Sequence, residues 1–168
     1  DPDIDEENYL RVIRYKTAKL FEAAGRLGGV LGGGTEEEKD ALARYGMHLG
    51  TAFQLIDDVL DYSGDFLKTG KNIGDDLAEG KPTLPLLYAM KHGTAEQAAS
   101  IRQAIEHGGL TEFQSVLAAI KDTHALQYTR EAAQREIQTA NAAISTLPDS
   151  KFKSALLQLA AFAVDRSF

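Results

Sequence analysis

Apolar residues recur every three or four positions along most of the chain, which is the spacing of one face of an α-helix. This pattern predicts a long amphipathic helix over residues 6–31, which the glycine-rich sequence GGVLGGG then ends. Further helices are expected over residues 36–63, 126–147 and 149–164. No run of alternating β-branched residues indicates a strand, so we expect an all-α fold. The apolar positions of the first helix are Leu10, Ile13, Thr17, Leu20, Ala24, Leu27 and Leu31.

Capping boxes predict where three of the helices begin. In this motif a Ser or Thr side chain accepts a hydrogen bond from the backbone three residues later, and a Glu or Gln at that position bonds back. The three boxes pair Thr35 with Glu38, Thr94 with Gln97, and Thr111 with Gln114.

One long segment lacks helical periodicity: GDFLKTGKNIGDDLAEGKPT, residues 64–83. Loops of this length in compact domains tend to carry function. Glycines let a backbone approach an anion closely, and lysines supply mobile positive charges. The segment is therefore a candidate anion-binding loop, in which Lys68, Lys71 and Lys81 alternate with Gly70, Gly74 and Gly80.

The composition is that of a globular protein, because 43% of the 168 residues are hydrophobic and 26% are charged, which argues against disorder. The length suffices for one domain or for part of a larger one. The most apolar run, ALLQLAAFAV (Ala155 to Val164), is too short to cross a membrane, and we expect it to form a buried terminal helix. The chain starts at Asp1 and not at Met, which suggests an excised part of a longer protein.

Charge and cysteine usage narrow the possible functions. Eighteen basic and 25 acidic residues give a net charge of −7, which disfavours binding to nucleic acid and to anionic membranes. The absence of cysteine excludes disulfides and thiolate metal sites, so any metal has oxygen or imidazole ligands. It also agrees with a reducing cytoplasm, where we expect the protein to act.

The strongest candidate for chemistry is an acidic cluster near the end of the 36–63 helix, in the sequence FQLIDDVLD. At about 100° per residue, its polar side chains fall within an arc of about 100°. Apolar residues fill the rest of the circumference, so this helix should be largely buried. The polar stripe consists of Gln54, Asp57, Asp58 and Asp61.

Carboxylates one helical turn apart repel each other, and the helix dipole disfavours anions at this end of a helix. The arrangement costs stability unless a cation lies between the side chains. Mg²⁺ fits, because it takes oxygen ligands and is commonly shared with substrate phosphates. The alternative is a solvated acidic face, which the apolar flanks disfavour, and an EF-hand is excluded by the spacing. A phosphate bound there would need basic partners, and Lys16 and Thr17 interrupt the first helix at a suitable place.

Three stretches resemble the C-terminal half of a trans-isoprenyl diphosphate synthase: KTA (residues 16–18), YGMHLGTAFQLIDDVLDYSGD (45–65) and GKNIGDDLAEGKPTLPLLYA (70–89). They occur in the order and at the spacing of that family. The resemblance is strong over residues 9–92 and extends to the rest only as compatible helices. Within the family, the EGKPTLP sequence is most similar to long-chain bacterial members, the octaprenyl ones that serve ubiquinone biosynthesis.

The resemblance implies an all-α bundle of the isoprenoid synthase type and a prenyl transfer reaction. Magnesium would hold the diphosphate of an allylic substrate, with farnesyl diphosphate the expected primer, and isopentenyl diphosphate would attack the resulting cation. Asp57 and Asp61 would bind Mg²⁺ with Asp58 in support, and Lys16 would join these three as a catalytic residue. The residues implied at the allylic diphosphate are Lys16, Thr17, Gln54 and Lys71, with Lys81 and Arg166 as weaker candidates.

The chain departs from the family pattern in one large respect. The other DDxxD motif of the family, with its neighbouring arginines, does not occur in this sequence. Residues 1–168 are therefore expected to be the C-terminal part of a single synthase domain, without prenyl transfer activity alone. A homodimer is implied for the full-length protein.

Two alternatives remain open. One is a non-catalytic helical subunit of a heteromeric prenyl synthase, and the other is an unrelated helical metal-binding domain. If the chain lacks helices that would normally pack against it, the faces they would cover should be exposed, including the apolar side of the acidic helix. Self-association or poor solubility is then expected.

Overall fold

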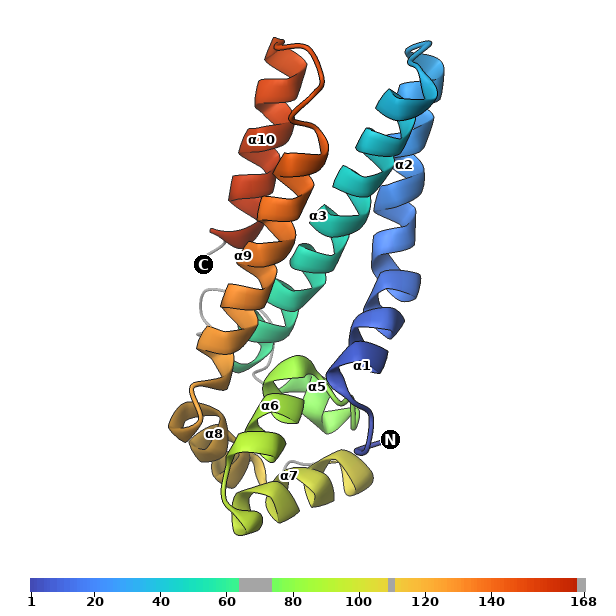
Figure 1. Ribbon diagram of the computed structural model, residues 1–168. Coiled ribbons are helices and arrows are strands. Elements are labelled where there is room, and N and C mark those ends of the chain that lie inside the picture. Colours follow the sequence, from blue (N-terminus) through green and yellow to red (C-terminus); the bar gives the residue numbers. More distant parts are fainter. Residues whose placement is uncertain (64–73, 109–110, 166–168) are drawn as a thin grey trace. The chain divides into compact units, whose positions relative to one another are not determined.

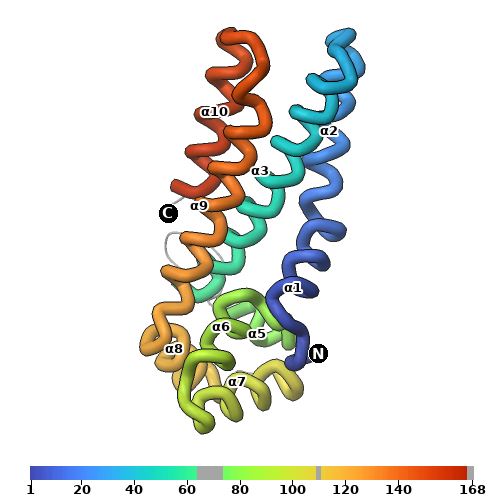
Figure 2. The backbone as a smooth tube through the Cα atoms, viewed as in Figure 1, coloured from blue at the N-terminus to red at the C-terminus, as the bar shows by residue number. Residues whose placement is uncertain are grey.

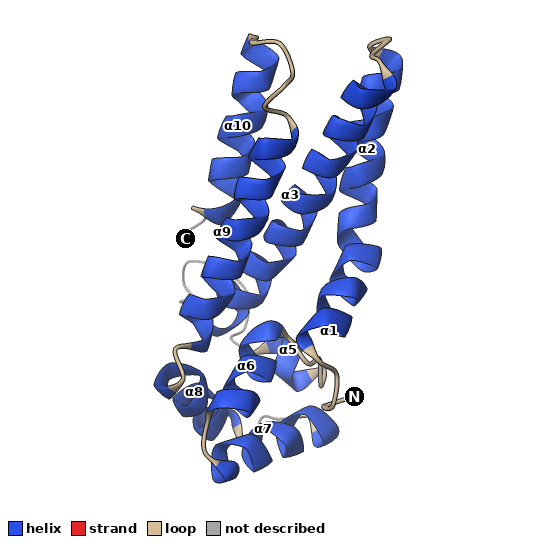
Figure 3. Cartoon of the chain, in the orientation of Figure 1, coloured by secondary structure: helices blue, strands red, loops and turns tan. Residues whose placement is uncertain are grey.

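The computed structural model describes residues 1–63, 74–108 and 111–165, and every regular element in these ranges is a helix, as expected (Figures 1 and 3). None of the helices in these ranges combines the length and the apolar character needed to span a bilayer. The helices are α1 (Glu6–Ile13), the π-helix η1 (Arg14–Ala18), α2 (Lys19–Leu31), α3 (Glu36–Ser63), α5 (Asp75–Ala78), α6 (Leu84–His92), α7 (Ala95–His107), α8 (Phe113–Asp122), α9 (Ala125–Ala143) and α10 (Lys151–Val164).

The chain forms two compact units, and their boundary falls inside α1, α3 and α9. The first unit combines Asp1–Tyr9 with Asp57–Glu131, and in it α6, α7 and α8 pack on one another. Its core is aliphatic with one phenol at its edge, and the fully buried members include Leu77, Leu86, Ile101 and Val116. Pro85 lies in the first turn of α6, where a missing N–H costs no intrahelical hydrogen bond.

The second unit combines Leu10–Ile56 with the chain from Ala132 onward. Figure 2 shows two antiparallel helix pairs in it, α2 with α3 and α9 with α10. The first pair is in backbone contact, because a Cβ at Gly25 would lie 2.2 Å from the carbonyl oxygen of Leu42. A Cβ at Gly46 would lie 2.2 Å from that of Phe21. Glycine is therefore required where the two helices cross most closely.

The π-turn Arg14–Ala18 changes which face of the first long helix is buried. Ile13 and Ala18 are both buried, five residues apart, which is the π-helical and not the α-helical spacing. The face of α2 that packs on α3 is consequently the glycine face. The leucine stripe that we expected to form the apolar face is largely exposed, with Leu20 at 76% and Leu31 at 87%.

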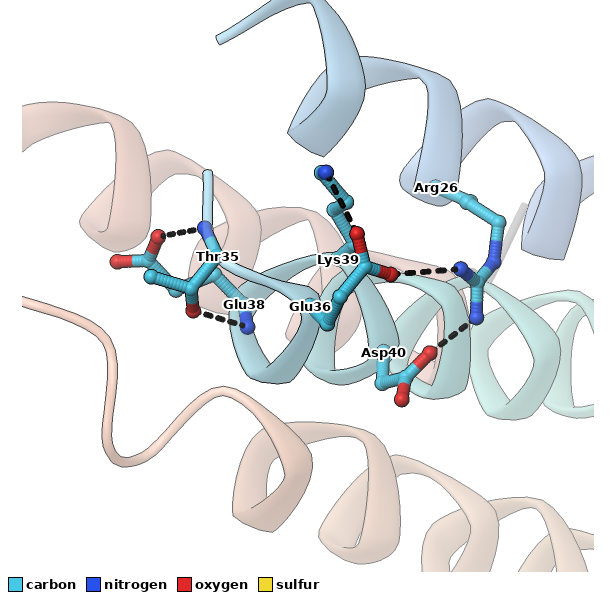
Figure 4. A network of polar contacts seen from close by, with 6 residues as sticks. All are labelled: Arg26, Thr35, Glu36, Glu38, Lys39 and Asp40. Atoms are coloured by element: carbon cyan, nitrogen blue, oxygen red, sulfur yellow. Dashed lines mark hydrogen bonds and ion pairs between the residues drawn. The ribbon is translucent and has the colours of Figure 1, made fainter. Parts of the chain in front are cut away.

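Two of the three capping boxes are confirmed. Thr35 and Glu38 exchange backbone-to-side-chain bonds of 2.8 and 3.3 Å at the start of α3 (Figure 4), and Thr94 and Gln97 do the same at α7. The box at Thr111 is wrong, because α8 begins only at Phe113 and its first turn has no side-chain cap. Gln114 is thus the second helical residue, one position short of where a box needs it.

The final helix and the acidic helix also differ from expectation. The apolar side of α3 is buried and not exposed, as Leu55 and Val59 show. By contrast α10, which we expected to be buried, buries only Ala160 and Ala163 and leaves Phe152 71% and Phe162 61% exposed. The helix before it, α9, ends four residues earlier than the predicted residue 147. In α10 it is small residues that make the buried contacts, so hydrophobic size is a poor guide to burial in this helix.

We expect Gly46→Ala to lower the free energy of unfolding by about 1–3 kcal/mol, because the new methyl group would push α2 away from α3. Gly28→Ala is a matched control on α2, where a Cβ meets no atom within 4 Å. It should leave stability unchanged or raise it by up to about 1 kcal/mol through helix propensity. Urea unfolding followed by circular dichroism measures both, and equal stability of the two variants would contradict the backbone contact.

Candidate functional site

Helix α3 carries the acidic stripe, and its bounds are those that the sequence predicts. Asp58 is only 2% exposed, whereas Gln54, Asp57 and Asp61 are half-buried. The alternative of a solvated acidic face is therefore wrong for Asp58. The unit boundary falls between Ile56 and Asp57, so Gln54 belongs to the second unit and the three carboxylates belong to the first.

The buried carboxylate of Asp58 accepts a hydrogen bond from the hydroxyl of Tyr9 on α1. Burial, followed by the neighbouring charge of Asp58, raises the pKa of Tyr9 well above its ordinary value. The phenol therefore remains a donor at physiological pH, which offsets part of the cost of burying a carboxylate. The sequence analysis missed Tyr9, since no local signal links residues 49 positions apart.

Asp61 lies among other carboxylates of the first unit. Its Oδ2 accepts the backbone N–H of Asp76 at 3.3 Å, and its carbonyl accepts the N–H of Gly74 at 2.9 Å. Burial first, and then the charges of Asp76 and Asp75, raise the pKa of Asp61 to about 6. Gly74 has φ +84° and immediately precedes α5, and a left-handed residue with a side chain would be strained there. The turn thus holds two further carboxyl groups close to Asp61.

Lys81 is engaged by carboxylates within the same unit. Its Nζ lies 2.7 Å from Glu79 Oε2 and 2.9 Å from Asp76 Oδ1. The hydrogen bonds to Glu79 and then to Asp76 raise the pKa of Lys81. Lys81 therefore offsets the charge of the group next to Asp61, and its role at a diphosphate stays a prediction.

In the second unit, the structure brings together two residues that the sequence analysis selected. The hydroxyl of Thr17 in η1 donates to Oε1 of Gln54 on α3 at 3.1 Å. Lys16, the preceding residue of the π-turn, is exposed. A π-turn inside a helix frequently marks a functional site.

Other predicted site residues cannot be placed. Lys68, Gly70, Lys71 and Arg166 lie outside the described residues. In the part of the chain that the structure describes, no three Asp, Glu or His side chains converge as a ready-made metal site. Asp58 is turned to Tyr9, so the metal roles of Asp57, Asp58 and Asp61 stay predictions. The available ligands are carboxylate oxygens, which suit Mg²⁺ or Ca²⁺ and not a softer metal.

Comparison with known proteins identifies the family. Residues 1–122 match the model of one protein family, Polyprenyl synthetase. The chain belongs to this family. It is 55% identical to the octaprenyl diphosphate synthase of Haemophilus influenzae over 100% of the chain and 51% of that protein. It is 56% identical to the Escherichia coli octaprenyl diphosphate synthase over 99% of the chain and 52% of that protein. The chain thus spans about half the length of these curated relatives.

Solved structures of this family share the fold. A polyprenyl synthase from Caulobacter crescentus, complexed with calcium and isoprenyl diphosphate, superimposes with a TM-score of 0.92 at 40% identity, covering 99% of this chain and 51% of that one. The heptaprenyl diphosphate synthase of Staphylococcus aureus gives 0.92 at 30% identity, over 100% and 52%. The all-α isoprenoid synthase fold expected from the sequence is confirmed.

We expect Tyr9→Phe to lower the free energy of unfolding by about 1–3 kcal/mol, because buried Asp58 loses a hydrogen-bond donor while the ring still fills its place. Tyr15→Phe is the matched control, since that side chain is 71% exposed. Chemical denaturation of both variants tests this. A Tyr9→Phe variant as stable as Tyr15→Phe would show that the contact contributes nothing.

Proposed function

We propose that this chain is the C-terminal half of a trans-polyprenyl diphosphate synthase that condenses an allylic diphosphate with isopentenyl diphosphate. The product is octaprenyl diphosphate for the ubiquinone side chain, and the primer is farnesyl diphosphate. The full-length protein is a cytoplasmic homodimer. The observation that carries the proposal is the 55–56% identity to two octaprenyl diphosphate synthases over essentially the whole chain.

The carboxylates bind the metal, and the basic and neutral polar residues contact the diphosphate. Asp57 and Asp61, supported by Asp58, bind Mg²⁺ through hard carboxylate oxygens. The bound metal neutralises charge on the departing diphosphate, which helps the allylic carbon–oxygen bond to break. Calcium and isoprenyl diphosphate in the Caulobacter crescentus structure support this pairing of cation and diphosphate. The diphosphate contacts come from Lys16, Thr17, Gln54 and Lys71, with Lys81 and Arg166 as further candidates.

The charges of the first unit agree with a cation site. Burial, and then the nearby charges of Asp76 and Asp75, raise the pKa of Asp61. Lys81 is paired with Asp76. Repulsion among these carboxylates is the cost that a divalent ion would remove. Asp61 and Asp76 are half-buried, which reduces their solvation and strengthens their interaction with a bound cation.

A magnesium-dependent rise in melting temperature tests the metal site. With excess Mg²⁺ and farnesyl thiodiphosphate at about 100 times its Kd, the full-length protein should melt about 3–5 °C higher. Asp57→Ala and Asp61→Ala should abolish the rise, whereas Glu131→Gln, on an exposed position of α9, should keep it. A rise that persists in both aspartate variants would contradict the assigned ligands.

The 168-residue chain alone should show no prenyl transfer. It contains one aspartate-rich helix, so isopentenyl diphosphate would lack the other half of its site. Incubation with farnesyl diphosphate, isopentenyl diphosphate and Mg²⁺, followed by product chromatography, measures this, with the full-length protein as the positive control. Clear turnover by the isolated chain would disprove the assignment as half an active site.

The same pair of assays addresses the non-catalytic alternative. A helical subunit without catalytic function has no need of the polar stripe of α3, yet Gln54, Asp57, Asp58 and Asp61 are all present. If the full-length protein forms no product and its melting temperature does not rise with Mg²⁺ and the diphosphate, it is a non-catalytic subunit and not an enzyme.

A further inference from the structure

The π-turn that carries Lys16 and Thr17 is tied to its neighbours at both ends. Thr17, near its end, bonds to Gln54 on α3. Arg14, its first residue, donates from a terminal guanidinium nitrogen to Oε1 of Glu136 on α9 at 3.1 Å. All of these residues belong to the second unit, so the two ties act within one compact body.

Glu136 also connects the turn to α3 through a second contact. Its other oxygen, Oε2, lies 2.5 Å from Nδ1 of His48. The carboxylate thus joins three helical segments, with one oxygen directed to η1 and the other to α3. His48 and Gln54 lie six residues apart on α3, so the two ties meet that helix at different levels.

Arg14, Glu136 and His48 form a network whose central carboxylate is largely buried. The side chains of Glu136 and His48 are only 15% and 17% exposed. Burial alone would raise the pKa of Glu136, but the hydrogen bond from His48 and the charges of His48 and Arg14 outweigh it and lower that pKa. The carboxylate is therefore ionised and paired on both sides.

The network is not optimised for stability. Nε of Arg14 is buried and has no hydrogen-bond partner among the described residues, which lowers stability. A buried ion pair is itself weak evidence of stabilisation, since desolvation offsets much of the attraction. A π-turn is also less favourable than an α-turn and persists only where surrounding contacts determine it. These costs coincide at the segment that presents Lys16 and Thr17.

We propose that Glu136 is a positioning residue: it holds η1 in π-helical register through Arg14 and His48, so that Lys16 and Thr17 are directed at the allylic diphosphate. This role rests on the proposed function. Without the tie, residues 14–18 can relax toward α-helical geometry, in which the side chains of the turn change direction around the helix axis. The expected effect falls on recognition of the allylic substrate and not on isopentenyl diphosphate.

Steady-state kinetics of the full-length synthase separates positioning from general stability. Glu136→Ala should raise KM for farnesyl diphosphate about tenfold, since small misplacements of binding groups are costly, while KM for isopentenyl diphosphate stays the same. Glu136→Gln retains an oxygen for Arg14 and should recover most of the affinity. Asp40→Asn is the control, because it breaks the ion pair of Arg26 with Asp40 in the same unit, far along α3 from the turn (Figure 4).

The outcomes distinguish the possible failures. Equal changes in both KM values, or a loss of melting temperature without a change in either, would overturn the positioning role. If Glu136→Ala does not fold, Arg14→Met decides, because it removes the tie to η1 and leaves the contact between His48 and Glu136; an unchanged KM for farnesyl diphosphate in it refutes the proposal. If Lys16→Ala and Thr17→Ala leave that KM unchanged, the assigned diphosphate site fails instead.

Discussion

Helix α3 must keep a row of polar side chains in surroundings that are otherwise apolar, and each of them needs a partner. Along the described part of the stripe, Gln54 is paired with Thr17, Asp58 with Tyr9, and Asp61 with a backbone N–H of the α5 turn. These three partners come from segments that are distant in sequence. The need to satisfy the stripe therefore explains why η1, α1 and the α5 turn have the positions they have within their units.

The same requirement links stability to function. A stripe without electrostatic strain would give no reason to expect a ligand, but burial and the charges of Asp76 and Asp75 raise the pKa of Asp61. Proteins commonly retain such unfavourable local charge where a ligand will complete it. The electrostatics of Asp61 thus agree with the metal role that we predict for this end of α3.

The sequence was sufficient for features that depend on local order. The bounds of α3, the caps at Thr35 and Thr94, and the motifs of the family are all readable from neighbouring residues. The donor Tyr9 and the carboxylate Glu136 were missed, because each acts through a contact with a residue far along the chain. The exposed leucine stripe of α2 was misjudged for a different reason: a single π-turn at Arg14–Ala18 shifts the helical register, and an α-helical period of 3.6 does not allow for it. The crossing of α2 and α3 depends on glycines such as Gly46, which carry no hydrophobic signal.

The π-turn also bears on how this helix can change in evolution. A π-turn holds one residue more than an α-turn, so loss of a single codon between Arg14 and Ala18 would leave an uninterrupted α-helix. Ile13 and Ala18, both buried and now five residues apart, would then be four apart, which is the α-helical spacing, so both would keep the same face. A gap next to Lys16 in an alignment would therefore mark a lineage that has lost the wide turn itself while the helix on either side still meets its neighbours through the same faces.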